Sequence, residues 1–251
     1  MKHFENDTVV REVTPGVWTF SKPFTRYGIL PIGGRSTVIK LSTQTDGKDD
    51  LWILASTPLT LETKTKVDEL GVPKYLISPD SDHHLFLGEW KRVYPAAKLI
   101  GPAVVAAKKP ELKFDGVYGK DPEETHYGFE DEIEARYFSG FIKEDIAFLH
   151  KPSKTLLEAD LIFNQPCTEQ YSIVGGSGPF FGATFTPYTK QAKKLLWKGV
   201  KKDGFDAMAV DSIAVSGWDF ERIIPCHGDV IENDAKEAWN EAFKWHMQGK
   251  D

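Results

Sequence analysis

Short apolar runs rich in β-branched and aromatic residues dominate the first 56 residues of the chain. Such runs are typical of β-strands, and clusters of Pro, Gly and Asp that favour turns separate them. The turn clusters are Pro15-Gly16, Gly33-Gly34 and Asp46-Gly47, and the expected strands cover 17–20, 36–41 and 51–55. The chain therefore begins as β-structure.

Beyond residue 56 the apolar positions first take the spacing of a helix. Leu61, Val67 and Leu70 lie at helical intervals, and Gly71 marks the end of that helix. The same analysis predicts strands over 74–78 and 98–100, and helices over 84–94 and 104–109 that end before prolines. This alternation of strands and helices predicts parallel strands in part of a sheet.

The second half of the chain repeats that order, with strands first and helices after them. Strands are expected over 132–138, 145–150, 155–157 and 222–225, and helices over 189–202, 205–216 and 234–248, the last with Asn233 as N-cap. A turn at 151–154 predicts an antiparallel hairpin. Two such halves, face to face, predict an α/β fold, a four-layer αββα sandwich with the helices outside.

Composition narrows the class of protein. The 251 residues, of which 41% are hydrophobic, suit one large domain or two small ones that need no disulfide. Only two cysteines are present, which fits a reducing compartment. The net charge is -6 and the basic residues form no long block, so nucleic acid is not an expected partner.

Two further patterns bear on where the protein works. No stretch approaches the ~20 consecutive apolar residues of a membrane span. The polar N-terminal segment has no apolar core of the signal-peptide type. We therefore expect a cytoplasmic protein that acts on a small-molecule substrate and has no membrane partner.

Carboxylates and imidazoles gather where expected strands end. Asp160 and His227 each follow a strand, and a third strand leads into Asp82, His83 and His84. Strand ends on one side of a layered sheet protein converge, and sites are commonly built there. Asp and His are standard ligands of Zn²⁺ and of non-haem iron. The sequence therefore predicts a metal site at these strand ends.

Nearly the whole chain carries stretches that match one known family in order and spacing. They run from residue 9 to about residue 245 and include 17–20 with 33–37, 82–90 with 94–95, 156–163 and 225–228. Together they resemble the metallo-β-lactamase fold superfamily and, within it, a β-lactamase-like family defined only as a domain of unknown function. The resemblance implies a single domain over 1–251, the αββα sandwich, and a metal-dependent hydrolase.

The metal motif of that superfamily is altered in this chain. The motif reads His-x-His-x-Asp-His, and the matching segment places Ser78 and Asp80 at both leading histidines and His83 at the last. A shift by one residue makes His84 the final histidine, and the leading histidines are missing in that alignment too. The resemblance therefore implies that the three-histidine metal position has lost its ligands.

The superfamily ligands that come later in the chain also differ between the two metal positions. Phe141 matches a histidine of the lost position, whereas Asp160 and His227 match ligands of the second position. The resemblance thus favours a mononuclear centre over a two-metal one. A single Zn or Fe ion would be held by ligands drawn from Asp82, His83, His84, Asp160 and His227.

Three functions fit these residues. In the first, metal-activated water attacks an ester, lactone or amide carbonyl, with Asp82 and His227 in the catalytic set. In the second, a metal-free protein or a non-hydrolytic enzyme binds an apolar small molecule in the same cleft. The third is Fe(II)-dependent oxygen chemistry. Aromatic residues of the loop at 168–186 either line an apolar pocket or seal the sheet edge; they are Tyr171, Phe180, Phe181 and Phe185.

Other polar residues near the strand ends carry smaller expectations. His150 lies beside a turn and is expected to face solvent. Asp229 is placed to orient the His227 ring as a second partner. Arg35 and Lys40 are candidates to attract an anionic substrate.

Overall fold

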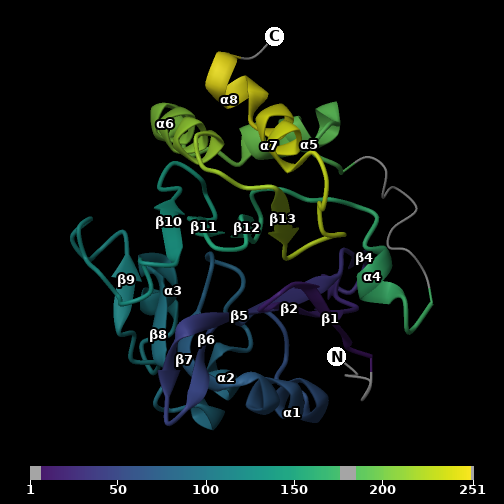
Figure 1. The fold of residues 1–251 in the computed structure, drawn as a ribbon. Coiled ribbons are helices and arrows are strands. Elements are labelled where there is room, and N and C mark those ends of the chain that lie inside the picture. The colour runs from purple at the N-terminus through teal and green to yellow at the C-terminus, as the bar shows by residue number, and fades with distance from the viewer. Residues whose placement is uncertain (1–6, 176–184, 250–251) are drawn as a thin grey trace.

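The computed structural model describes residues 7–175 and 185–249 as two facing sheets between layers of helices (Figure 1). The larger sheet has seven strands in the order β1-β2-β5-β6-β7-β8-β9. Neighbours from β1 to β6 are antiparallel, and those from β6 to β9 are parallel, as the alternating pattern predicted. The strands are β1 (Val9–Thr14), β2 (Val17–Lys22), β5 (Gly34–Thr45), β6 (Lys48–Leu54), β7 (Val72–Ile77), β8 (Lys98–Pro102) and β9 (Gly116–Tyr118).

The smaller sheet has four strands in the order β10-β11-β12-β13. The predicted hairpin between β11 and β12 is confirmed, and β12 and β13 run parallel. A separate two-stranded hairpin joins β3 (Thr25–Arg26) to β4 (Leu30–Pro31). The strands of the smaller sheet are β10 (Ile133–Tyr137), β11 (Ile146–His150), β12 (Thr155–Glu158) and β13 (Arg222–Pro225).

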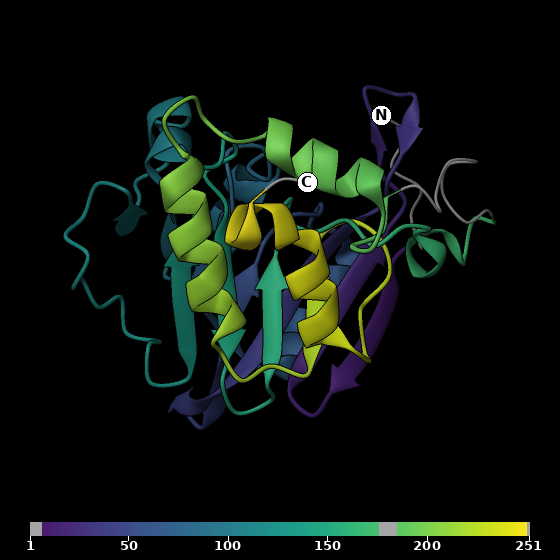
Figure 2. The same ribbon diagram turned by 90° about the horizontal axis from the view of Figure 1, so that it is seen from above.

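Helices cover the outer face of each sheet (Figures 1 and 2). Three of them lie against the larger sheet: α1 (Leu61–Leu70), α2 (Leu87–Val93) and α3 (Ala103–Lys108). Four form the opposite layer: α5 (Lys190–Lys198), α6 (Phe205–Ser216), α7 (Ala235–Ala242) and α8 (Lys244–Gln248). The short helix α4 (Thr168–Tyr171) lies beside β2.

Three hydrophobic cores separate these four layers. Adjacent strand residues alternate between cores: Val38 packs under the outer helices of the larger sheet, whereas Ile39 packs between the sheets. In the smaller sheet Leu157 faces the space between the sheets, and Leu156 faces the C-terminal helices. This alternation is the period of two expected of strands. The predicted αββα sandwich is therefore confirmed.

The chain departs from the sequence prediction at its C-terminal helix. In place of one helix over 234–248, α7 and α8 meet at Phe243, whose φ of -94° and ψ of 8° interrupt the helix. The ring of Phe243 stacks on Trp239 with centroids 4.3 Å apart, so packing fixes the break. The predicted N-cap was also wrong, because the N-cap is Asp234, in a left-handed conformation that Asp tolerates.

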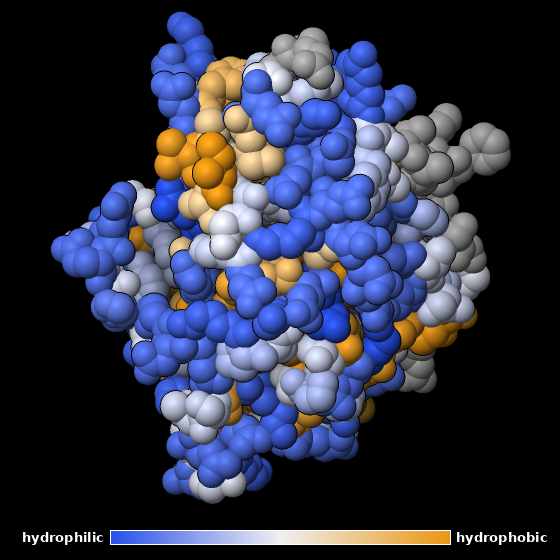
Figure 3. Space-filling model, turned by 45° about the horizontal axis from the view of Figure 1, so that its top comes forward, coloured by the Kyte–Doolittle hydropathy of each residue, from blue (hydrophilic) through white to orange (hydrophobic). Residues whose placement is uncertain are grey.

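The polarity of the surface can be followed on one face of the molecule. Figure 3 shows one face on which hydrophilic residues predominate and hydrophobic ones form small patches. Within the described ranges, no helix is long and apolar enough to cross a membrane. Phe180 and Phe181, two of the aromatic residues singled out in the long loop, lie outside the described residues.

Candidate metal centre

Strand register brings Asp160 and His227 to one edge. β12 and β13 are parallel neighbours, and Glu158 pairs with Pro225 at their ends. Asp160 and His227 each lie two residues beyond that last pair, so they leave the sheet side by side. The backbone N–H of Asp160 donates to the carboxylate of Asp145 at 2.6 Å, which fixes the turn after β12.

The turn after β13 needs glycine. Gly228 has a φ of +97°, and a Cβ there would lie 2.1 Å from the carbonyl oxygen of Asn164. This close approach holds the His227 segment against the segment that follows Asp160.

Asp80 positions His83 from the other sheet. After β7 ends, the Oδ1 atom of Asp80 accepts the backbone N–H groups of Asp82 and His83 at 2.9 and 2.8 Å. The same oxygen lies 2.8 Å from Nδ1 of the His83 ring. Asp80 therefore shapes the turn and orients the imidazole at once, and it occupies a position where the superfamily motif has a histidine.

Two aromatic rings and one hydrogen bond hold the ring of His227. It stacks on Phe163 with centroids 5.1 Å apart and on Phe24 at 6.2 Å. Its Nδ1 atom lies 2.7 Å from the carbonyl oxygen of Gly33, so Nδ1 carries the proton and donates. Nε2 of His227 is therefore left with a lone pair.

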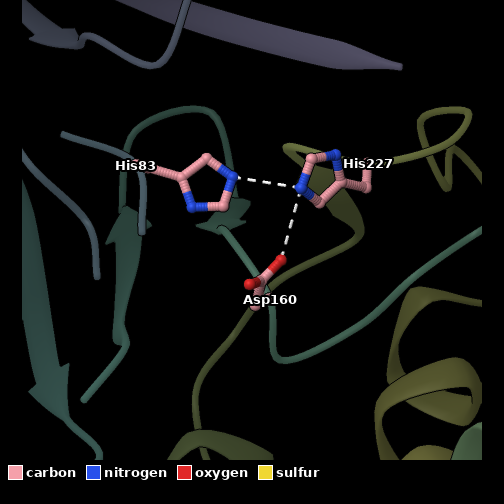
Figure 4. Close-up of side chains that lie close together, drawn as sticks. All are labelled: His83, Asp160 and His227. Atoms are coloured by element: carbon pink, nitrogen blue, oxygen red, sulfur yellow. Dashed lines mark hydrogen bonds and ion pairs between the residues drawn. The ribbon is translucent and has the colours of Figure 1, made fainter. Parts of the chain in front are cut away.

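The three side chains converge on one point (Figure 4). The Nε2 atoms of His83 and His227 are 3.1 Å apart, and Nε2 of His227 is 3.3 Å from Oδ1 of Asp160. Zn–N and Zn–O bonds of 2.0–2.1 Å in a tetrahedron set ligand atoms about 3.3 Å apart. Oδ1 of Asp160 is buried and has no hydrogen-bond partner. Two of the three separations match this spacing, and all three ligand atoms lie within 4.8 Å of one another, so the donor set fits a single metal ion.

Burial and charge act differently on the three groups. Burial works to lower the pKa of His83, but the charge and hydrogen bond of Asp80 outweigh it and raise that pKa to about 9. Burial lowers the pKa of His227 to about 4. Burial works to raise the pKa of Asp160, and the charges of the two imidazoles, Lys143 and Arg26 bring it below its usual value. The site therefore favours an ionised carboxylate beside a neutral His227.

The other two predicted ligands lie outside this group. Oδ2 of Asp82 accepts from the Arg26 guanidinium at 2.7 Å and also pairs with the Lys143 ammonium. His84 is half-buried, and burial together with Lys108 and Lys109 lowers its pKa. His83 is thus the member of the histidine pair that faces Asp160 and His227.

Ser78 and Phe141, which the resemblance matches to histidines of the superfamily, both have other contacts. Ser78 donates its hydroxyl to the backbone of Asp80 at 3.4 Å, and Phe141 packs in the core under the C-terminal helices. Among residues 7–175 and 185–249, His83, Asp160 and His227 make the one group of three or more such side chains that could hold an ion.

Two buried acids near the site were not singled out from the sequence. Asp145 and Glu158 are fully buried, and burial raises the pKa of both well above the usual range. Glu158 accepts the backbone N–H groups of Leu161 and Ile162 at 2.9 and 3.0 Å. A carboxylate inside an otherwise apolar strand is the one signal that could have marked them.

A cavity of about 620 Å³ adjoins Asp160. From the sequence, only the aromatic residues of the loop at 168–186 were candidates to line such a pocket. Phe185 lines it, whereas Tyr171 turns away and donates its hydroxyl to the carbonyl of Phe24 at 2.9 Å. The cations Arg26 and Lys143 lie in its wall. Neither stands in a recognisable motif, because Arg26 belongs to the short strand β3 and Lys143 to the loop before β11, which only the fold brings to Asp160.

Of the two cations expected to attract an anionic substrate, Arg35 is contradicted by the structure. Arg35 is fully buried and donates to the carbonyls of Pro225 and Gly228 at 2.6 and 2.7 Å, so it braces the site from behind. Lys40 pairs with Asp49 at 2.6 Å. Arg35 is therefore not available to an anionic substrate, and Lys40 is not among the residues that line the cavity beside Asp160.

Two expectations about histidines were wrong as well. Asp229 does not orient His227, because its carboxylate accepts from Thr168 and from the backbone N–H of Glu169. His150 is buried on a central strand of the smaller sheet, with Nδ1 2.7 Å from the Ser153 hydroxyl.

No family model and no curated protein matches the chain in sequence. Solved structures do match it in fold. A metallo-β-lactamase from Erythrobacter litoralis, with β-mercaptoethanol in its active site, has a TM-score of 0.62 at 11% identity over 97% of this chain and 98% of its own. DIM-1 metallo-β-lactamase exposed to ceftazidime has a TM-score of 0.60 at 12% identity, covering 95% and 97%.

A third structure is similar in fold. FIM-1 metallo-β-lactamase from Pseudomonas aeruginosa, in its mono-zinc form, has a TM-score of 0.56 at 12% identity, covering 96% of this chain and 94% of its own. At these identities the likeness establishes the fold, and the activity has to be argued from the site. The chain has the metallo-β-lactamase fold.

Proposed function

We propose that this metallo-β-lactamase-fold protein is a metal-dependent hydrolase whose mononuclear centre is held by His83, Asp160 and His227. The observation that carries the proposal is the convergence of two Nε2 atoms and one carboxylate oxygen within 4.8 Å of one another. Three protein ligands leave a coordination position open, as in catalytic zinc sites.

The hydrogen bonds behind the ligands support an ion over a purely structural role. Nδ1 of each imidazole is engaged, by the Asp80 carboxylate in one ring and by the Gly33 carbonyl in the other. Such outer partners set the tautomer and leave Nε2 for a metal. Without a cation, the two Nε2 atoms at 3.1 Å are compatible only if a proton lies between them. An ion would take the place of that proton.

Each residue has a distinct task in this proposal. A bound ion lowers the pKa of its water towards ~7 and polarises a carbonyl. Asp160 holds a negative charge at the site, and His227 is packed against two aromatic rings. Asp82 is engaged by Arg26 and Lys143, so it steadies these two cations beside Asp160. The reaction that fits is hydrolysis of an ester, lactone or amide.

Two alternatives have observations of their own. Two imidazoles and one carboxylate are also the ligand set of non-haem Fe(II) oxygenases, so iron would favour oxygen chemistry. The apolar cavity beside Asp160 would serve a metal-free binding protein equally well. The metal content separates these three functions.

The test begins with elemental analysis of protein purified without chelator. We expect about one Zn or Fe ion per chain, and hydrolysis of at least one member of an ester, lactone and amide panel. The variant His83→Ala should lose the ion, and the neighbouring His84→Ala should keep it. Chains that take up neither Zn²⁺ nor Fe²⁺ would overturn the proposal in favour of a binding role, and uptake of iron with oxygen consumption would favour the oxygenase.

A further inference from the structure

The cavity of about 620 Å³ opens from the candidate metal centre towards the surface. One end is polar, where Asp160, Arg26 and Lys143 lie, and the remaining wall is almost wholly apolar. Its wall comes from segments far apart in the chain, and the apolar members include Leu30, Phe141, Ile142, Leu161, Ile162, Leu195 and Leu196.

We propose that this cavity binds the apolar chain of a long-chain carboxylic acid or of its ester, with the carboxyl end at Arg26 and Lys143. The proposal names the substrate class of the proposed hydrolase, and only turnover rests on that function. Binding itself rests on the cavity and the two cations.

The apolar lining is continuous from the core to the surface. Phe141, Leu161 and Leu196 are buried at its base. At its mouth Ile142 and Leu195 are 53% and 49% exposed, and both line the same cavity. The β3–β4 hairpin, which stands out from the body of the molecule in Figure 2, adds further apolar side chains to this rim. A lining of this kind suits an extended apolar chain that enters from solvent.

The polar end has the charge to bind a carboxylate. Arg26 and Lys143 lie 3.9 and 3.6 Å from Oδ2 of Asp160, and both also pair with Asp82. The Asp82 side chain is 32% exposed, and ion pairs this exposed contribute little. A ligand carboxylate can therefore displace Asp82 and take its place between the two cations.

Calorimetry with simple amphiphiles tests the proposal directly. The probes are dodecanoate, dodecan-1-ol, butanoate and dodecyl phosphate, titrated into the protein as purified and into the same protein after dialysis against chelator. We expect dodecanoate to bind in both states, and at least tenfold more tightly than the alcohol, which lacks the charge, or butanoate, which lacks the chain. Tighter binding of dodecyl phosphate than of dodecanoate would reject the carboxylate class.

Variants at the polar end of the cavity test where the carboxylate of the ligand binds. Lys143→Gln should weaken dodecanoate binding about tenfold and leave dodecan-1-ol unchanged. The matched control is Lys201→Gln, which removes a surface cation that pairs with Glu144 outside the cavity. Asp82→Asn should tighten dodecanoate binding, because the competing carboxylate is gone. A merely structural role for Asp82 gives no such gain.

A bulky residue in the wall tests the position of the chain. Ala192 lines the cavity from α5, so Ala192→Trp should abolish binding of both dodecanoate and dodecan-1-ol. Lys198→Trp places the same ring at an exposed position of that helix and should bind like the parent. Equal binding by both Trp variants would overturn the proposal.

The proposed metal centre and the proposed ligand class can be rejected independently of each other. A protein that takes up neither Zn²⁺ nor Fe²⁺ but still binds dodecanoate would keep the ligand class and reject the hydrolase. A protein that holds an ion but binds no dodecanoate in either state would keep the metal centre and reject the ligand class.

Discussion

Two of the regions that hold buried histidines differ in their surroundings. At the strand ends, His83 and His227 each have a hydrogen-bond partner for Nδ1 and turn Nε2 towards the other ring. In the C-terminal helical layer, His246 lies between the rings of Trp197 and Phe243, and neither of its nitrogens has a hydrogen-bond partner.

The comparison separates burial from function. Burial lowers the pKa of His227 and of His246 alike to about 4. A strongly shifted pKa therefore does not by itself mark a site. The two regions differ in where the polar atoms point. Around His227 they meet at one point, whereas the nitrogens of His246 face aromatic rings. We take convergence of lone pairs as the sign of an ion site.

The largest effect should come from removing one imidazole from each region. His227→Ala should reduce the metal content from about one ion per chain to nearly none, because two ligands cannot close the site. His246→Ala should keep the ion and instead lower the free energy of unfolding, since it leaves a gap between aromatic rings. Elemental analysis and urea denaturation of both variants measure the two effects. Equal metal loss in both would abolish the distinction between the regions.

A smaller change at Asp80 would sharpen the comparison. In Asp80→Asn the amide oxygen can still accept the backbone N–H groups of Asp82 and His83, so the turn should persist. The charge behind the His83 ring is lost, however, and metal affinity should fall about 10–100-fold. Competition with a chromophoric chelator measures the affinity. Asp49→Asn, which removes a carboxylate paired with Lys40 elsewhere, is the control and should leave the affinity unchanged.

The fold and part of the site follow from local sequence patterns. Strands such as β12 and β13 are apolar runs bounded by turns, and their parallel pairing places the two residues that follow them side by side. That register explains why Asp160 and His227 could be named from the sequence. The choice of His83 over His84 depends on the Asp80 turn, which no periodicity encodes.

Long-range contacts account for what the sequence could not give. Arg26 and Lys143 are separated by more than one hundred residues and meet only because the β3–β4 hairpin and the loop before β11 border one cavity. Arg35 was misjudged for the same reason, because its carbonyl partners Pro225 and Gly228 come from the other end of the chain. From the sequence alone, a charged residue such as Arg35 is expected to lie at the surface. In the structure Arg35 is fully buried, so its role is different.

The smallest effect we expect concerns the pH dependence of stability at His246. Its pKa in the folded protein is about 4, below the ordinary value of 6.5, because burial disfavours the charged ring. Between these two values the unfolded chain binds a proton that the folded chain does not, so stability falls as the pH drops from 6.5 towards 4. Above 6.5 both states hold a neutral ring, and the contribution does not change.

His246→Leu removes this group and keeps a side chain of similar size among the same rings. The free energy of unfolding, measured by urea titration at pH 7 and at pH 4.5, should therefore fall less for the variant than for the parent. The difference should be on the order of 2 kcal/mol. His227 shares the same sign of shift, so some loss at low pH should persist in the variant. Equal losses of unfolding free energy in parent and variant would mean that His246 takes up a proton freely in the folded protein. The C-terminal helical layer would then admit water, unlike the strand ends.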